Sequence, residues 1–114
     1  MPLSYFELTI RLVLSIFLGG LIGLERETVN RPAGFRTHIL VCLGSTVIML
    51  VSLFIFNEFS GQTNIDPGRI PAQVISGIGF LGAGTIIIEG ADVKGLTTAA
   101  SLWTVAAIGL AVGV

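Results

Sequence analysis

The side chains of this sequence that could do chemistry are mostly charged, and four of the seven carboxylates lie in two short stretches. The first stretch is Glu25-Arg26-Glu27, and the second contains Glu89 and Asp92. Carboxylate oxygens are the ligands that hard divalent cations prefer, and Mg²⁺ needs few of them because it keeps several waters. The candidate metal ligands are therefore Glu25, Glu27, Glu89 and Asp92, with Mg²⁺ as the ion to consider and no other cofactor expected.

A block of four glycines, at positions 77, 79, 82 and 84, offers a second kind of chemistry. The first three match the pattern G-x-G-x-x-G, whose glycines let a backbone approach the phosphates of a dinucleotide. That use requires a preceding strand, a soluble helix and an acidic residue about 20 positions further on. The flanks instead form an uncharged run from residue 70 to residue 88, and the next acidic residues come too early. We therefore interpret the block as a surface on which membrane helices pack closely.

The sequence lacks the residue patterns that other catalytic and binding sites require. His38 has no nucleophile and orienting acid at motif-like spacing, and no cysteine and histidine cluster suggests zinc. Cys42 is the only cysteine, so it forms no internal disulfide. Six basic and seven acidic residues leave no basic surface for nucleic acid. We expect neither an enzyme nor a nucleic-acid-binding protein.

The composition indicates whether the chain folds in water or in a membrane. Apolar residues make up 53% of it, charged residues make up 11%, and the mean hydropathy is +0.93. Soluble domains carry about a quarter of charged residues, so this is a membrane chain. Its 114 residues suffice for four membrane-spanning helices and little else. We expect one all-α domain over residues 1–114, a polytopic transmembrane helix bundle of about four spans in the lipid bilayer.

Four apolar segments define the expected spans, at residues 5–24, 39–56, 71–88 and 97–114. Asp66 and Pro67 predict a helix start, with Asp66 as the capping residue, and Pro71 predicts a kink soon after it. Glu7 and Arg11 lie one helical turn apart in the first span. They form either an ion pair at the membrane surface or a charge pair that lines a path through the membrane.

The positions of the basic residues set the expected orientation. Cytoplasmic loops of membrane proteins are enriched in lysine and arginine. Two loops, 25–37 and 89–96, carry four of the six basic residues: Arg26, Arg31, Arg36 and Lys94. We therefore expect both loops in the cytoplasm and the N-terminus outside.

Small residues recur at helical spacing in three of the four spans. Lipid tails are as apolar as leucine, so membrane helices associate through close packing of such residues. The second span has few of them, and we expect it to face more lipid. The predicted packing residues are Gly19, Gly23, Ser76, Gly79, Ala83, Gly109 and Gly113. These faces predict a homo-oligomer and contacts with other membrane proteins.

Four ordered sequence strings now stand together, at residues 20–27, 31–38, 73–84 and 94–103. Their order and spacing closely resemble the MgtC/SapB family of bacterial inner-membrane proteins. The resemblance implies location in the bacterial inner membrane, a fifth transmembrane helix and, in many members, a cytoplasmic C-terminal domain. We expect this chain to be the transmembrane domain alone, without the C-terminal domain.

The resemblance also implies a function. It suggests a role in adaptation to low magnesium and in survival inside host cells during virulence, exerted by modulating other membrane proteins such as the F-type ATP synthase. The alternatives are a cation (Mg²⁺) transporter or channel, and a simple membrane anchor. The family motifs point to these polar positions: Glu25, Arg26, Glu27, Arg36, Thr37, His38, Asp66, Arg69, Gln73 and Lys94.

Overall fold

The computed structural model describes the chain except for residues 1–2, 29–32, 60, 62–65 and 90–91, and for residues 87–89 and 92–94 it describes the backbone alone. Arg31 of the predicted cytoplasmic loop therefore lies outside the described residues. The elements are α1 (Tyr5–Thr28), α2 (Phe35–Phe59), α3 (Arg69–Ala83), β1 (Ile87–Glu89), β2 (Asp92–Lys94) and α4 (Leu96–Gly113).

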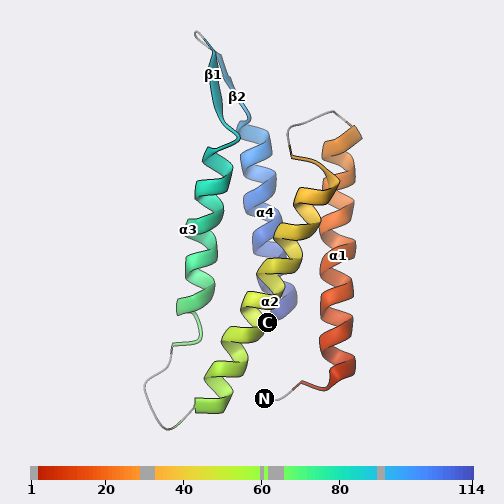
Figure 1. The fold of residues 1–114 in the computed structure, drawn as a ribbon, viewed down its shortest axis with the longest axis vertical. Coiled ribbons are helices and arrows are strands. Elements are labelled where there is room, and N and C mark those ends of the chain that lie inside the picture. Colours follow the sequence, from red (N-terminus) through yellow and green to blue (C-terminus); the bar gives the residue numbers. More distant parts are fainter. Residues whose placement is uncertain (1–2, 29–32, 60, 62–65, 90–91) are drawn as a thin grey trace.

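The helices run side by side along the long axis of the molecule, with α2 and α4 between α1 and α3 (Figure 1). The molecule measures 55 × 29 × 13 Å along its principal axes, so the helices form a thin layer. A small hairpin, β1–β2, extends from the end at which α3 stops and α4 begins (Figure 1). The predicted all-α helix bundle is confirmed.

Three of the helices are long and apolar enough to cross a membrane: α1, α2 and α4. The third predicted span, 71–88, is wrong in its last five residues, because α3 ends at Ala83 after only 15 residues. The backbone turns there, and the Thr85 hydroxyl donates a 2.6 Å hydrogen bond to the carbonyl of Gly82. The next residues, 86–88, are isoleucines, which favour strands. In the hairpin, Ile87 faces Lys94 and Glu89 faces Asp92.

The start of α3 also differs from the prediction. Gly68 is the capping position, and the helix begins at Arg69 rather than at Pro67. Asp66 stabilises the preceding turn, since its Oδ1 accepts a 2.8 Å hydrogen bond from the backbone N–H of Gly68. Pro71 falls in the first helical turn, where backbone N–H groups have no helical partner in any case. The helix therefore continues through Pro71 instead of breaking there.

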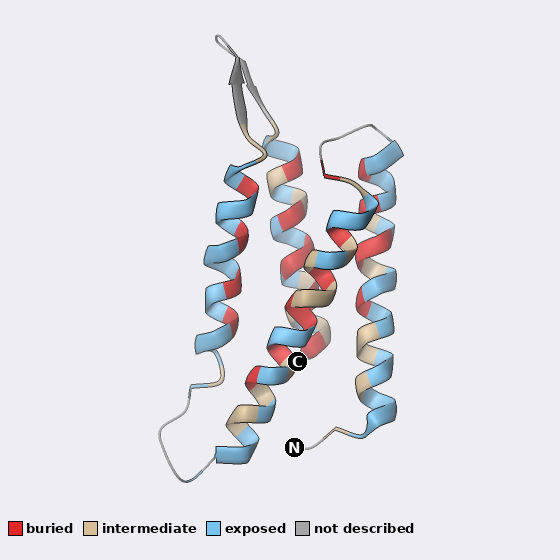
Figure 2. Cartoon of the chain, in the orientation of Figure 1, coloured by how far each residue is buried: buried red, intermediate tan, exposed pale blue. Residues whose placement is uncertain are grey.

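Glycines let α1 and α4 approach α2 closely. A β-carbon at Gly19 would lie 2.8 Å from Cβ of Cys42, and one at Gly113 would lie 2.7 Å from Cβ of Met49. Real Cβ atoms almost never come so near to another side chain, so glycine is the residue that fits. The buried residues of all three helices face one another (Figure 2). The second helix is therefore the centre of the packing and not the most lipid-exposed element.

The α3 helix packs through a different face from the one that its small residues predict. Its buried residues are Pro71, Val74, Ile78 and Gly82. Val74 and Ile78 join Leu102 and Ala106 of α4 in one apolar cluster. The predicted packing residues of this helix, Ser76, Gly79 and Ala83, are exposed instead.

Candidate functional site

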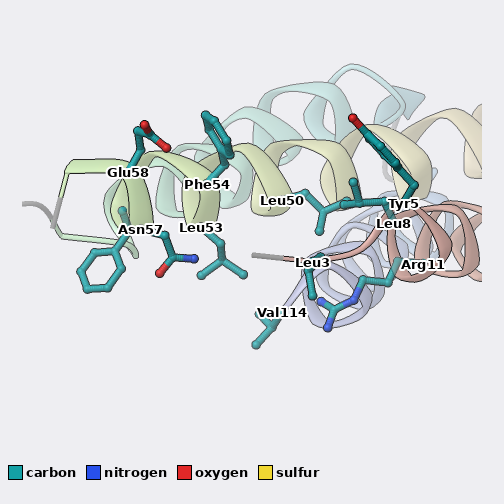
Figure 3. Close-up of a pocket in the computed structure, with 11 residues that line it drawn as sticks. Leu3, Tyr5, Leu8, Arg11, Leu50, Leu53, Phe54, Asn57, Glu58 and Val114 are labelled. Carbon is teal, nitrogen blue, oxygen red and sulfur yellow. The ribbon is translucent and has the colours of Figure 1, made fainter. Parts of the chain in front are cut away.

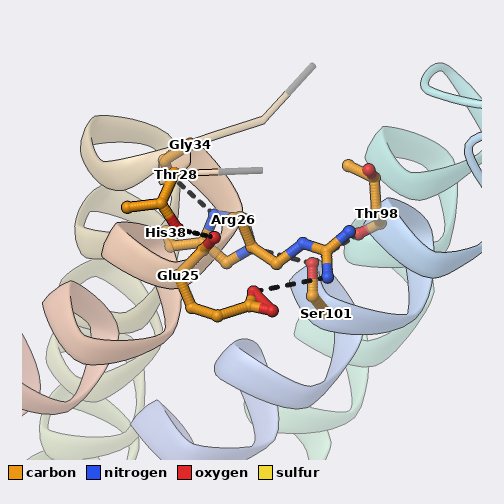
Figure 4. A network of polar contacts seen from close by, with 7 residues as sticks. All are labelled: Glu25, Arg26, Thr28, Gly34, His38, Thr98 and Ser101. Atoms are coloured by element: carbon orange, nitrogen blue, oxygen red, sulfur yellow. Dashed lines mark hydrogen bonds and ion pairs between the residues drawn. The ribbon is translucent and has the colours of Figure 1, made fainter. Parts of the chain in front are cut away.

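The most enclosed polar arrangement lies where α1 ends and where α2 and α4 begin (Figure 4). His38 is fully buried there, although the sequence places it next to the end of an apolar run. Its Nδ1 is 2.8 Å from the carbonyl of Gly34, and its Nε2 is 2.8 Å from the hydroxyl of Ser101. A carbonyl only accepts hydrogen bonds, so Nδ1 carries a proton. The imidazole thereby ties the first turn of α2 to α4.

Arg26 lies in the last turn of α1 and is buried, with 9% of its surface exposed. Its Nη1 is 3.5 Å from a carboxylate oxygen of Glu25. The Glu25 side chain is 61% exposed, so this is a long ion pair at the surface and not a buried carboxylate held by arginine. The other two nitrogens of the guanidinium, Nε and Nη2, are buried and have no hydrogen-bond partner. A charged group with two unpaired donors is the least satisfied feature of the described residues.

The remaining predicted polar residues of this end are at the surface. Glu27, Arg36 and Thr37 are exposed. The backbone of β2 brings Lys94 to the same end of the bundle (Figure 1).

The predicted metal ligands divide into two pairs. Glu25 and Glu27 are exposed at the end of α1, and Glu89 and Asp92 face each other in the backbone of the hairpin. The side chains of the second pair lie outside the described residues. Within the described part of the chain, no three histidine, cysteine, aspartate or glutamate side chains come close enough to hold a metal ion.

Three predicted site residues, Asp66, Arg69 and Gln73, are exposed near the start of α3. This start lies at the opposite end of the bundle from the start of α4 (Figure 1). The ten polar positions therefore form two separate groups and not one cluster.

Arg11 takes a partner that the sequence does not suggest. Its guanidinium donates a 2.6 Å hydrogen bond to the carbonyl of Gly113, at the end of α4. It does so instead of forming the predicted ion pair with Glu7. Arg11 also lines an open pocket of about 710 Å³, together with Leu8, Leu53 and Glu58 (Figure 3).

Buried hydroxyls form a second set of helix contacts. The Thr46 hydroxyl lies 3.0 Å from the carbonyl of Cys42 and 2.9 Å from the carbonyl of Gly109. The Ser52 hydroxyl donates to the carbonyl of Pro67 at 2.7 Å. Sequence reasoning missed both residues, because a hydroxyl in an apolar run has no spacing that marks its partner. These bonds fasten α2 to α4 and to the segment before α3.

Comparison with known proteins identifies relatives over nearly the whole chain. The sequence profile of the MgtC family matches residues 12–114. The protein named "Putative magnesium transporter YhiD" from Escherichia coli K12 is 44% identical over 109 residues, which cover 94% of this chain and 51% of that protein. Protein MgtC from Salmonella typhimurium LT2 is 48% identical over 109 residues, which cover 95% of this chain and 44% of that protein.

An uncharacterised protein from Synechocystis, slr0014, is 43% identical over 111 residues, which cover 97% of this chain and 45% of that protein. The chain thus spans about half the length of the curated relatives that it matches. No solved structure is similar enough to count as a match. A family profile that covers nine-tenths of the chain is decisive, and the chain belongs to the MgtC family of membrane proteins.

Proposed function

We propose that the chain is a regulatory protein of the bacterial inner membrane that acts by binding other membrane proteins, such as the F-type ATP synthase. Its role would be in adaptation to low magnesium and in survival inside host cells. The observation that carries the proposal is the outward face of α3. Gly79 lies in the middle of this face, and a β-carbon there would have no neighbour within 4 Å.

The predicted stripe of small residues on α3 points away from the rest of the bundle, whereas Gly82 faces α4. An α-helix turns about 100° per residue, so the stripe of Ala72, Ser76, Gly79 and Ala83 is centred about 130° from the buried face. Small residues on an exposed membrane helix allow another helix to approach its backbone. This face is therefore suited to a helix from outside the chain, either a second copy or a different membrane protein.

The buried polar groups described above support the same proposal. His38 bonds to Ser101, and Thr46 bonds to the carbonyl of Gly109. Buried polar residues of transporters usually line a path for the transported ion. In this chain, His38 and Thr46 instead form hydrogen bonds that hold α2 and α4 together. The exposed small residues of α3, by contrast, have no role in packing within the chain, and we propose that they form the docking surface.

The proposed orientation has both loops, 25–37 and 89–96, in the cytoplasm. The end of α1, the start of α2 and the hairpin lie at one end of the bundle (Figure 1). Of the five basic residues that the structure describes, Arg26, Arg36 and Lys94 belong to this end, which is the distribution that the positive-inside rule associates with a cytoplasmic end.

Substitution of Gly79 by leucine tests the docking surface. The open space around Gly79 accommodates a larger side chain, so we expect the thermal unfolding midpoint of the chain in detergent to stay the same. A leucine would keep a partner helix from approaching. In inverted bacterial membrane vesicles, the chain should change the rate of ATP-driven proton pumping, measured by quenching of a pH-sensitive dye. The variant should need at least tenfold more protein for the same effect.

A matched control for this experiment is Gly44→Leu. Gly44 also has no neighbour within 4 Å of a β-carbon, but it lies on α2. This variant should act on proton pumping like the unmodified chain. If the Gly79 and Gly44 variants act alike, the face of α3 is not the docking surface. If the unmodified chain has no effect on pumping, the ATP synthase is not its target.

The name of the Escherichia coli relative supports a second candidate, a magnesium transporter. Flux of Mg²⁺ and of protons into proteoliposomes that contain the purified chain separates the two functions. We expect flux no greater than in empty liposomes. Magnesium flux that is abolished by Glu25→Gln, while the exposed-residue control Thr37→Ala retains it, would overturn the regulatory proposal.

A further inference from the structure

The unpaired nitrogens of Arg26 lie on one edge of its guanidinium group. Nε and Nη2 carry parallel N–H bonds, and this is the edge that binds two oxygens of a carboxylate or phosphate side by side. Both nitrogens are buried and without a partner, whereas Nη1 has Glu25 at 3.5 Å. Burial of unpaired donors on a charged group is costly, so an anion at this edge would remove a large penalty.

A second group of unpaired donors lies at the start of α4. The helix is capped by Gly95, whose φ of 92° is left-handed, and no side chain caps the first turn. The first helical hydrogen bond runs from the N–H of Ala99 to the carbonyl of Gly95. The N–H groups of residues 96–98 therefore have no helical partner, and the helix dipole makes this end attractive to anions. Figure 4 shows the Arg26 side chain extending from α1 toward α4, where Thr98 and Ser101 lie.

We propose that Arg26 and the amino end of α4 bind a phosphate group, supplied by a phospholipid headgroup. Arg26 is in the last turn of α1, the exposed Glu27 follows it in sequence, and the exposed Arg36 lies in the first turn of α2 at the same end of the bundle. This is the level at which a membrane helix meets the headgroups, and basic pockets between helices are known to bind them there. The phosphate takes the Nε–Nη2 edge, and Glu25, whose weak ion pair is at Nη1, does not compete for it.

The test measures the thermal unfolding midpoint of the purified, delipidated chain in a maltoside detergent. Three additions are titrated separately: phosphatidylglycerol, diacylglycerol with the same acyl chains, and inorganic phosphate. We expect phosphatidylglycerol to raise the midpoint at concentrations at least tenfold lower than diacylglycerol does, because only the former carries the phosphate. Inorganic phosphate that raises the midpoint as effectively as the lipid would support the site, with free phosphate as its ligand.

Two variants and one control test whether the Nε–Nη2 edge of Arg26 causes the rise in the unfolding midpoint. Arg26→Met removes a buried unpaired charge and should fold, but it should lose at least tenfold in apparent affinity for phosphatidylglycerol. Arg26→Lys keeps the charge without the paired donors and should bind with an intermediate affinity. The control, Arg36→Met, removes an exposed charge at the same end and should change the affinity less than twofold.

Two results would overturn the proposal. One is an equal response of the unmodified chain and of Arg26→Met to phosphatidylglycerol. The other is the absence of any response of the unmodified chain to both phosphate sources. In that second case, the ligand of the unpaired edge of Arg26 would be a carboxylate of a protein partner.

Discussion

Substitution of Gly109 by leucine is expected to prevent the helix bundle from forming. A β-carbon at Gly109 would collide with the backbone carbonyl of Cys42 and lie 2.7 Å from Cβ of Ser45. Backbone atoms cannot move aside as a flexible side chain can, so α4 would have to separate from α2. That separation would also break the hydrogen bond from Thr46 to the carbonyl of Gly109. Even Gly109→Ala should destabilise the chain by about 1–3 kcal/mol, as overpacking of a core does.

The measurement is unfolding of the purified chain by increasing denaturant, followed by helical circular dichroism. The matched control is Gly44→Leu, because Gly44 lies two residues from Cys42 and has open space around it. We expect this control to unfold within about 0.5 kcal/mol of the unmodified chain, because a side chain at Gly44 meets no neighbour that must move. Equal stability of the Gly109 and Gly44 variants would contradict the packing of α4 against α2.

Substitution of His38 by alanine is expected to cost about 2–5 kcal/mol of stability. The imidazole is fully buried and lies 2.8 Å from partners on both sides, so the variant loses two hydrogen bonds and leaves a cavity. Ser101→Ala should cost less, about 1 kcal/mol, because it removes one hydroxyl and creates little empty space.

A double-mutant cycle on His38 and Ser101 isolates their interaction. We expect the double variant to be more stable than the sum of the two single effects predicts, by about 0.5–3 kcal/mol, since the residues are in contact. Thr37→Ala, at an exposed neighbouring position, is the control and should change little. Full additivity of the His38 and Ser101 effects would mean that the imidazole does not join α2 to α4.

The long apolar runs predict three of the four helices well, and they place α4 to within one residue, but they miss the polar turns at the ends of α1 and α2. The first apolar segment stops at residue 24, whereas α1 continues to Thr28. Its last turn contains Glu25, Arg26 and Glu27, which are good helix formers in spite of their charge. A hydropathy pattern predicts the apolar part of a helix that lies in lipid. It does not predict the polar turn that follows. This turn carries Arg26, the least satisfied residue of the site.

The glycine pattern predicts which helices approach closely, but not the surface that they meet. Gly19, Gly23, Gly109 and Gly113 all lie at helix contacts, as their spacing suggests. Their common neighbour, α2, has few glycines, but its buried face carries the small residues Cys42, Ser45, Thr46 and Ser52. The sequence pattern therefore identifies the glycine contacts more readily than contacts made by small residues that are not glycine.

The partners of the buried polar residues could not be predicted at all. His38 and Ser101 are 63 residues apart, and Arg11 and Gly113 are 102 residues apart. Nothing in either local pattern marks the other residue, since the pairing depends on how whole helices lie against one another. The prediction of the third span was wrong for a related reason. An uncharged run long enough to cross a membrane is divided between the helix α3 and the strand β1.

The shortness of α3 has a consequence for the surrounding membrane. At about 1.5 Å per residue, its 15 residues extend about 22 Å, whereas the hydrocarbon core of a bilayer is about 30 Å thick. A bilayer that contacts this edge of the molecule must become thinner there, at a cost of a fraction of a kcal/mol per Å of hydrophobic mismatch. Two proteins that share one thinned patch deform less lipid than two that stand apart. The membrane itself would then favour association at the edge formed by α3, before any side chains touch.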